Sequence, residues 1–310
     1  MITIYAKTDQ GLVNLNEPQT GCWINIMNPT AQEIESVTNL GIPSDYITYP
    51  LDLDERARSE RENGELLIIL RVPVFQGHGS DVPYTTVPLG IILTKNYLLT
   101  VCKVESDILR ELSVSHTKSL TPAKQERFVL YTFLRTAQKY LSNLREINKT
   151  VDILEDKLQL STRNKELLDL LKYQKSLTFF TTALKSNELM MERLRRNGMF
   201  VNYPEDQDLL EDVLTENQQA MEMTSISSNI LSSMMDAFAS IISNNVNSVM
   251  KLLASITIVL SIPIMVSSFY GMNVAHLPVA NTPYAFWVIL GVSVILTLIV
   301  FVLFYKRDWL

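Results

Sequence analysis

Residues 252–305 read LLASITIVLSIPIMVSSFYGMNVAHLPVANTPYAFWVILGVSVILTLIVFVLFY and contain no Lys, Arg, Asp or Glu. Two apolar stretches within them match the roughly 20 residues that a helix needs to cross a bilayer. They predict transmembrane helices at 252–270 and 284–305, joined by a loop at 271–283 and followed by a basic tail at 306–310. The alternative, two buried core helices of a soluble protein, leaves this sharp boundary in charge unexplained.

The basic residues around the two spans predict their orientation. Lys251 precedes the first span and Lys306 and Arg307 follow the second, whereas the loop contains neither Lys nor Arg. Because positively charged residues stay on the cytoplasmic side, both termini are expected in the cytoplasm and the loop outside. The first ten residues also lack the basic start and apolar core of a signal peptide. These features predict a multi-pass protein of the plasma (inner) membrane.

The part of the chain before the spans is acidic. The 310 residues carry a formal net charge of -6, and Lys251, Lys306 and Arg307 against Asp308 leave -8 for residues 1–250. An acidic soluble part argues against nucleic-acid binding and suits cationic ligands.

Residues 1–121 predict a cytoplasmic α/β domain. Thr30 and Glu33 have the spacing of a capping box, which opens a helix that ends near Gly41. Cys22 and Cys102 lie far apart without a CxxC motif, so both are predicted to be reduced core residues. Short runs rich in β-branched and aromatic residues predict five strands, whose order remains open: Ile2–Ala6, Trp23–Ile26, Leu66–Val74, Val87–Leu93 and Tyr97–Val101.

Residues 122–203 predict a long helical hairpin. Apolar residues recur at threes and fours from Leu130 to Leu158, the period of an amphipathic helix. A break is expected at 161–164, and the second helix is expected to end at Gly198, a residue that suits the left-handed cap.

Residues 204–251 predict a stalk helix that continues into the first span. Pro204 suits the first helical position, and the acidic residues after it suit the positive end of the helix. No Gly or Pro interrupts residues 205–262, so one helix of roughly 60 residues and about 90 Å is expected. The predicted fold class is an α+β membrane protein with an N-terminal α/β domain, long antiparallel helices and a stalk helix that enters the membrane.

One face of the first span is small and mildly polar. It carries Asn247, Met250, Leu253, Thr257, Ser261, Ile264 and Ser268. Small residues and hydroxyls let transmembrane helices pack closely, but the same face also suits the wall of a pore. Periodicity alone leaves both interpretations open, because one or two helices cannot enclose a channel.

The residues Tyr270-Gly271-Met272-Asn273 lie between the two spans. In this position they resemble the signature of the CorA family of magnesium and cobalt transporters, and the order of the domains resembles that family as well. The resemblance implies a homopentamer in which five copies of the first span line one axial pore for magnesium, and also for cobalt or nickel. It assigns the selectivity filter to Gly271, Met272 and Asn273, and the small polar face to the wall of the pore.

The signature fits the chemistry of a hydrated ion. Magnesium demands octahedral oxygen coordination and gives up its water slowly, so a ring of neutral Asn273 carboxamides can hydrogen-bond the hydration shell without removing it. Gly271 is expected in the left-handed conformation at the end of the first span. Unlike many family members, the loop has no acidic residue. Its only titratable side chain, His276, is expected to face solvent or, in five copies, to favour softer metals.

Acidic residues crowd the start of the stalk helix: Glu205, Asp206, Asp208, Glu211, Asp212 and Glu216. Asp208 and Asp212 are four residues apart, where like charges repel unless a cation lies between them. A solvated acidic face is the simpler interpretation. The resemblance implies a regulatory magnesium site between subunits, with Asp212 as the sensing acid. Its partner in the N-terminal domain is predicted to be Asp81, with Asp52 and Asp54 as the other candidates.

Two further functions remain open. One is a zinc transporter of the same family, and the other, from a different class, is a two-span receptor or scaffold without a pore. An enzyme is not expected, because the chain has no phosphate loop, HExxH or GxSxG motif and its three His are scattered. No cofactor is expected, and magnesium is predicted as substrate and regulatory ligand. The expected partners are further copies of the chain, divalent cations and the lipid bilayer, without nucleic acid.

Overall fold

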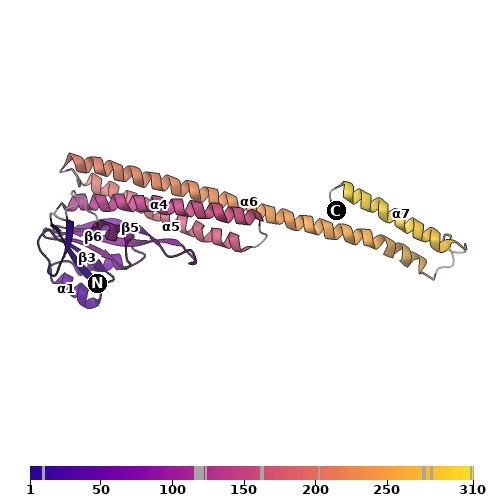
Figure 1. Cartoon of the computed structure of the whole chain (residues 1–310), viewed down its shortest axis with the longest axis horizontal. Helices are drawn as coiled ribbons and strands as arrows, with labels where there is room; N and C mark the ends of the chain where they lie inside the picture. Colours follow the sequence, from indigo (N-terminus) through magenta and orange to yellow (C-terminus); the bar gives the residue numbers. More distant parts are fainter. Residues whose placement is uncertain are drawn as a thin grey trace. The chain divides into compact units, whose positions relative to one another are not determined.

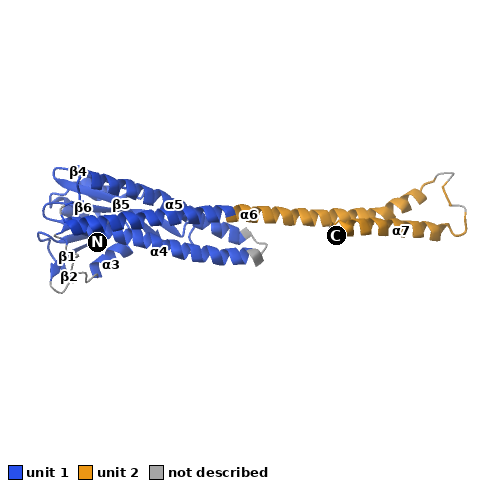
Figure 2. Ribbon diagram, turned by 90° about the horizontal axis from the view of Figure 1, so that it is seen from above, with its two compact units in different colours: residues 1–233 blue, residues 234–310 orange. Residues whose placement is uncertain are grey.

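A computed structural model describes residues 1–8, 11–114, 122, 124–160, 164–201, 203–273, 277–279, 282–307 and 309. The chain divides into two compact units, Met1–Ser233 and Met234–Leu310 (Figure 2). The division falls inside one helix, α6 (Pro204–Tyr270), which contributes to both units. Pro204 is its first residue and no break interrupts it, as the sequence predicts.

Unit 1 is built on a mixed sheet whose seven described strands follow the order β2-β1-β3-β7-β6-β5-β4. Neighbours are antiparallel except β3 and β7, which run parallel. The strands are β1 (Ile2–Thr8), β2 (Gly11–Leu15), β3 (Trp23–Met27), β4 (Arg58–Glu62), β5 (Glu65–Phe75), β6 (Tyr84–Leu93) and β7 (Leu98–Cys102). The five predicted strands are confirmed with small shifts at their ends, and β2 and β4 are additional.

A two-residue turn sets the register of the β4–β5 hairpin. Asn63 and Gly64 have φ values of 52° and 88°, and two consecutive positive φ values suit the tight turn whose twist matches that of the strands. The turn pairs Glu62 with Glu65. Because side chains alternate along a strand, this register decides which residues of β5 face each layer of helices.

Three short helices cover one face of the sheet: α1 (Ala31–Thr38), α2 (Ser44–Thr48) and the 3-10 helix η1 (Tyr49–Leu51). The predicted capping box of α1 is confirmed, since Glu33 N donates to Thr30 Oγ1 and Thr30 N donates to Glu33 Oε2. A Cβ atom at Gly90 of β6 would overlap the ring of Pro50, so glycine permits the close approach of η1 to the sheet.

Longer helices cover the opposite face (Figure 1): α3 (Asp107–Val114), α4 (Gln125–Leu160), α5 (Asn164–Arg196) and the start of α6. Trp23 of β3 joins the sheet to α4, because its ring stacks on Tyr5 at 4.8 Å and lies 5.0 Å from the ring of Phe128. Cys22 and Cys102 are buried free thiols, as predicted.

The predicted helical hairpin is present as α4 and α5, and residues 161–163 between them lie outside the described part of the chain. After the last basic residues of α5, Gly198 has a φ of 76°, which confirms the predicted left-handed cap. Together with the first part of α6, the hairpin forms a bundle of three helices on the sheet (Figure 1).

Unit 2 consists of the end of α6 and α7 (Ala285–Lys306), which runs back along α6 (Figure 1). Each of these helices contains an 18-residue apolar window of which 6% is buried. A core helix of a soluble protein is mostly buried, so the exposure of both windows suits contact with lipid. Within the described residues, these two helices are long and apolar enough to cross a membrane.

Candidate functional site

The signature Gly271-Met272-Asn273 follows the last turn of α6 without a reversal of the backbone. Gly271 N donates to Ser267 O at 2.9 Å, and Met272 N donates to Phe269 O at 3.4 Å. Gly271 is not among the glycines with positive φ, so the predicted left-handed cap at this residue is wrong. The helical hydrogen bond from Gly271 N explains the difference, because it extends α6 by one residue. A Cβ atom at Gly271 would lie 3.4 Å from Ser267 O.

The described part of the outer loop is tied to the end of α6. The Tyr270 hydroxyl donates to Pro278 O at 3.0 Å, which holds the loop against the residue that precedes the signature. Met272 and Asn273 are exposed in the single chain. His276 lies outside the described residues.

The predicted pore face is left uncovered within the chain. Six of its seven residues are exposed, Ile264 by 65% and Met250 by 60%, and Ser261 is half-buried. The Thr257 hydroxyl donates to Leu253 O at 2.8 Å and the Ser261 hydroxyl to Ile258 O at 2.8 Å. Both hydroxyls therefore satisfy their donors inside the helix, and their oxygen lone pairs remain available to a hydrated ion.

The opposite side of α6 packs within unit 2. Ser255 is fully buried, and positions at steps of three and four beyond it are half-buried: Val259, Ile262, Val266 and Tyr270. At 100° per residue, Ser255 and Ile264 lie about 180° apart on the helix. On α7, Ser293 is buried and Ile289, Thr297 and Val300 are half-buried. The predicted pore face and the packed face are thus two different sides of α6.

The acidic residues at the start of α6 divide into two groups. Asp208 and Asp212 are exposed, as a site between subunits requires. Asp206 is 2% exposed and accepts from Arg127 Nε of α4 at 2.6 Å, and Glu205 accepts from Arg127 Nη2 at 2.9 Å. These hydrogen bonds, the one to Asp206 first, raise the pKa of Arg127.

Asp81 lies in the turn between β5 and β6, beside α5. The pKa of Lys172 is raised chiefly by Asp169 and to a lesser degree by Asp81, which places Asp81 near α5 in its own chain. Among the described residues, no group of three or more His, Cys, Asp or Glu side chains is placed to hold a metal ion. One chain therefore does not bring Asp81 together with Asp208 and Asp212.

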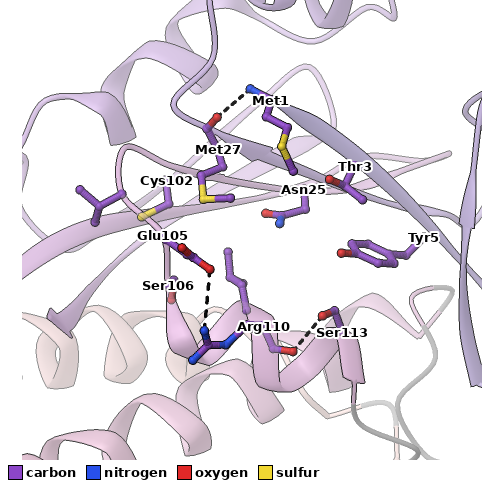
Figure 3. Close-up of a pocket in the computed structure, with 12 residues that line it drawn as sticks. Met1, Thr3, Tyr5, Asn25, Met27, Cys102, Glu105, Ser106, Arg110 and Ser113 are labelled. Carbon is purple, nitrogen blue, oxygen red and sulfur yellow. Dashed lines mark hydrogen bonds and ion pairs between the residues drawn. The ribbon is translucent and has the colours of Figure 1, made fainter. Parts of the chain in front are cut away.

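A separate pocket of about 190 Å³ lies between α3 and the sheet, at the ends of β3 and β7 (Figure 3). Its charged groups already pair with one another or with neighbours, since Arg110 lies 3.8 Å from Glu105 and 2.7 Å from Asp107. The amino group of Met1 donates to Met27 O at 2.8 Å. The pocket therefore offers no cluster of free carboxylates to a divalent cation.

These features define a class of protein. An α/β domain, a three-helix bundle and two exposed apolar helices make a membrane protein whose soluble part continues directly into its first span. The family model described as CorA-like Mg2+ transporter protein matches residues 18–307. The chain therefore belongs to the CorA-like Mg2+ transporter family, as the resemblance of its signature predicts.

Individual relatives agree with the family. The cobalt/magnesium transport protein CorA of Methanocaldococcus jannaschii is 29% identical over 299 residues, which cover 93% of this chain and 91% of that protein. The complete structure of the CorA magnesium transporter from the same organism is similar with a TM-score of 0.86 and 24% identity, over 100% of this chain and 99% of that one. This likeness confirms the predicted order of α/β domain, long helices and two C-terminal apolar helices.

A third comparison bears on the zinc alternative. The cytoplasmic domain of ZntB from Vibrio parahaemolyticus is similar with a TM-score of 0.60 and 10% identity, over 79% of this chain and 97% of that chain. At this identity the likeness shows a shared fold and carries no argument for zinc.

The sequence gives no local sign of one important contact. Arg127 and Asp206 are 79 residues apart, and the acid has the ordinary position of a first-turn residue that favours the positive helix end. Its burial follows from the packing of α6 on α4, which no periodic pattern in either helix reveals.

Proposed function

We propose that this chain is one subunit of a homopentameric channel that carries magnesium, and also cobalt or nickel, across the membrane. The observation that carries the proposal is the uncovered polar face of α6, opposite the side that packs in unit 2, with Gly271-Met272-Asn273 at its outer end. A single helix cannot enclose a pore, whereas five copies of this face around one axis can.

The residue types on this face suit a hydrated divalent ion. Asn273 at the mouth and Thr257, Ser261 and Ser268 along the wall offer neutral oxygens, which can hydrogen-bond the water shell of magnesium. Neutral groups bind weakly enough for release, whereas stripping the shell is slow. Met250 and Leu253 form an apolar ring below them, and Asn247 adds a further amide ring.

The orientation follows from the charges that flank the spans. With Lys251, Lys306 and Arg307 on the cytoplasmic side, unit 1 and both termini lie in the cytoplasm and the signature faces outward. The membrane potential then drives cations inward, at about 2.3 kcal/mol per elementary charge per 100 mV.

The exposed acids of α6 are the proposed regulatory site. Magnesium bound between Asp208 and Asp212 of one subunit and an acid of the next, for which we propose Asp81, would hold the α6 helices closed when cytoplasmic magnesium is high. When the ion leaves, the repulsion between the carboxylates favours separation.

A flux assay in proteoliposomes tests the conducting role. We expect uptake of magnesium that depends on membrane potential and not on a proton gradient, and a loss of at least tenfold in Asn273→Ala with the pentamer intact. Preferred uptake of zinc that needs a proton gradient would favour the zinc transporter. A monomer or dimer, or unchanged flux in Asn273→Ala, would favour a receptor or scaffold.

A second assay tests the regulatory site. Magnesium currents are expected to fall when cytoplasmic magnesium is raised, and this inhibition should disappear in Asp212→Ala. Glu222→Ala is a matched control, because Glu222 is an exposed acid farther along the same helix, hydrogen-bonded to Gln218 at 2.9 Å. Inhibition that persists unchanged in Asp212→Ala contradicts the assignment.

A further inference from the structure

The start of α6 is firmly fixed to the rest of unit 1. Arg127, 8% exposed, binds Asp206 and Glu205 at 2.6 and 2.9 Å, and the ring of Tyr203 lies 5.8 Å from its guanidinium group. One and two turns further on, Leu210 and Val213 enter the core that α4, α5 and the sheet share. A buried, hydrogen-bonded ion pair next to apolar contacts resists displacement, because separating it leaves a charge without a partner.

The contact changes character beyond Val213. The buried positions of α6 follow heptad spacing, as in a coiled coil: Leu210, Val213, Asn217, Ala220, Thr224, Ser227 and Leu231. The four residues from Asn217 to Ser227 in this series are small or polar. They bury little apolar surface against the hairpin, so this stretch, which we call the polar seam, binds α6 more weakly than its start does.

Few hydrogen bonds cross the polar seam, and they are easily exchanged. Asn217 Nδ2 donates to Leu184 O of α5 at 3.5 Å, the limit of a hydrogen bond, and the Thr224 hydroxyl donates to Ala220 O of its own helix. Gln174 Nε2 of α5 contacts the hydroxyls of both Ser228 and Ser232 at 3.1 Å, while Gln174 Oε1 is buried without a partner among the described residues.

The serines of α6 continue as a line on one side of the helix. Ser225, Ser228 and Ser232 follow at steps of three and four, so a movement of α6 by about one turn, 5.4 Å, exchanges one hydroxyl for the next at Gln174. A contact that can be remade after such a step is typical of an element that switches between discrete positions.

We propose that Arg127 and Asp206 are positioning residues that hold the start of α6 as a fixed point, while α6 shifts along the polar seam when the channel changes between its closed and conducting states. This inference rests on the proposed function, in which cations at Asp208 and Asp212 control the pore. Because α6 is one helix from Pro204 to Tyr270, a shift at the seam displaces the residues that line the pore.

Reversible cross-linking of the full-length protein in proteoliposomes tests the inference. One variant, Gln174→Cys with Ser228→Cys, joins α5 to α6 across the seam through a short bis-methanethiosulfonate reagent. The matched control, Lys124→Cys with Tyr203→Cys, joins the chain at the fixed point, where Lys124 Nζ lies 5.3 Å from the ring of Tyr203. The native thiols of Cys22 and Cys102 are 1% exposed and burial raises their pKa, so they react slowly.

Cross-linking the seam should reduce the response of magnesium flux to cytoplasmic magnesium at least tenfold, and dithiothreitol should restore it. Cross-linking the fixed point should leave the response unchanged. An unchanged response with the seam linked, or an equal loss in both variants, overturns the inference. Absence of magnesium flux before any cross-linking overturns the proposed function instead, so the two failures are distinct.

A point variant separates positioning from mere stability. Arg127→Ala should change the magnesium concentration for half-inhibition by threefold or more in the protein that remains assembled, and Arg127→Lys should change it less. If the residue only stabilised the fold, the amount of assembled protein would fall and that concentration would stay constant. This second result would contradict the inference.

Discussion

At the scale of single residues, side chains complete hydrogen bonds that the sheet leaves open. β4 pairs with β5 only from Glu65 to Ile69, so β5 has a free edge beyond that point. Asn187 of α5 replaces the missing strand, because its Oδ1 accepts from Arg71 N at 2.9 Å and its Nδ2 donates to Arg71 O at 2.8 Å. The buried Tyr140 hydroxyl donates to the same carbonyl at 3.0 Å.

This arrangement predicts unequal effects of two substitutions. Asn187→Ala leaves the Arg71 N–H buried without an acceptor and should lower the free energy of unfolding by about 1–3 kcal/mol. Tyr140→Phe removes one of two donors from a carbonyl that keeps the other, and should cost about 0.5–1.5 kcal/mol. Chemical denaturation of the detergent-solubilised protein measures both. An equal or larger loss in Tyr140→Phe would show that the edge of β5 does not depend on Asn187.

At the scale of elements, local patterns predict what local forces decide. β-branched runs such as Val87–Leu93 and the capping box at Thr30 predict a strand and a helix that are present. β4, with the sequence Arg58-Ser-Glu-Arg-Glu62, has no apolar alternation and exists because the Asn63–Gly64 turn brings it to β5. The parallel pairing of β3 with β7 joins residues about 75 positions apart, which no local pattern encodes.

The candidate site shows the same limit. The two spans, the uncovered face of α6 and the exposed acids follow from composition and helical period. Whether Gly271 turns left-handed depends on a single hydrogen bond at the end of the helix. The burial of Asp206 depends on a partner in α4. Both properties arise from tertiary contacts rather than from the residue types themselves.

The packing of unit 2 supports a prediction at this scale. Ser255 is fully buried, and its hydroxyl has no partner among the described residues. Ser255→Ala should therefore leave assembly and magnesium flux unchanged. Ser255→Leu adds volume where the helix surface is closely covered, and overpacking costs about 1–3 kcal/mol. We expect this variant to lose at least tenfold in flux.

Leu260 supplies the control for this experiment. It lies near the same depth and is 61% exposed, so Leu260→Phe adds comparable volume on an open side of α6. Flux and pentamer content measured together on all three variants decide the question. Normal flux in Ser255→Leu would mean that this side of α6 does not need close packing.

At the scale of the whole molecule, the chain is adapted to two solvents. The first 250 residues carry nearly all of the charge, and residues 252–305 carry none. Helix α6 belongs to both parts, so its soluble half can respond to cytoplasmic cations while its apolar half contacts lipid. This continuity makes cation binding in the cytoplasm and the state of the pore a single linked equilibrium.

Linkage of this kind predicts that magnesium stabilises the assembled protein. A ligand that binds the folded state alone adds about 2.7 kcal/mol at one hundred times its dissociation constant. Thermal unfolding should therefore shift upward with magnesium and return when EDTA removes it. Potassium chloride at equal ionic strength controls for screening, which acts on all exposed charges. Asp212→Ala should lose most of the shift, and Glu222→Ala should keep it. An equal shift in both variants would place the stabilising ion elsewhere, and no shift in the unmodified protein would remove the link between magnesium and the closed assembly.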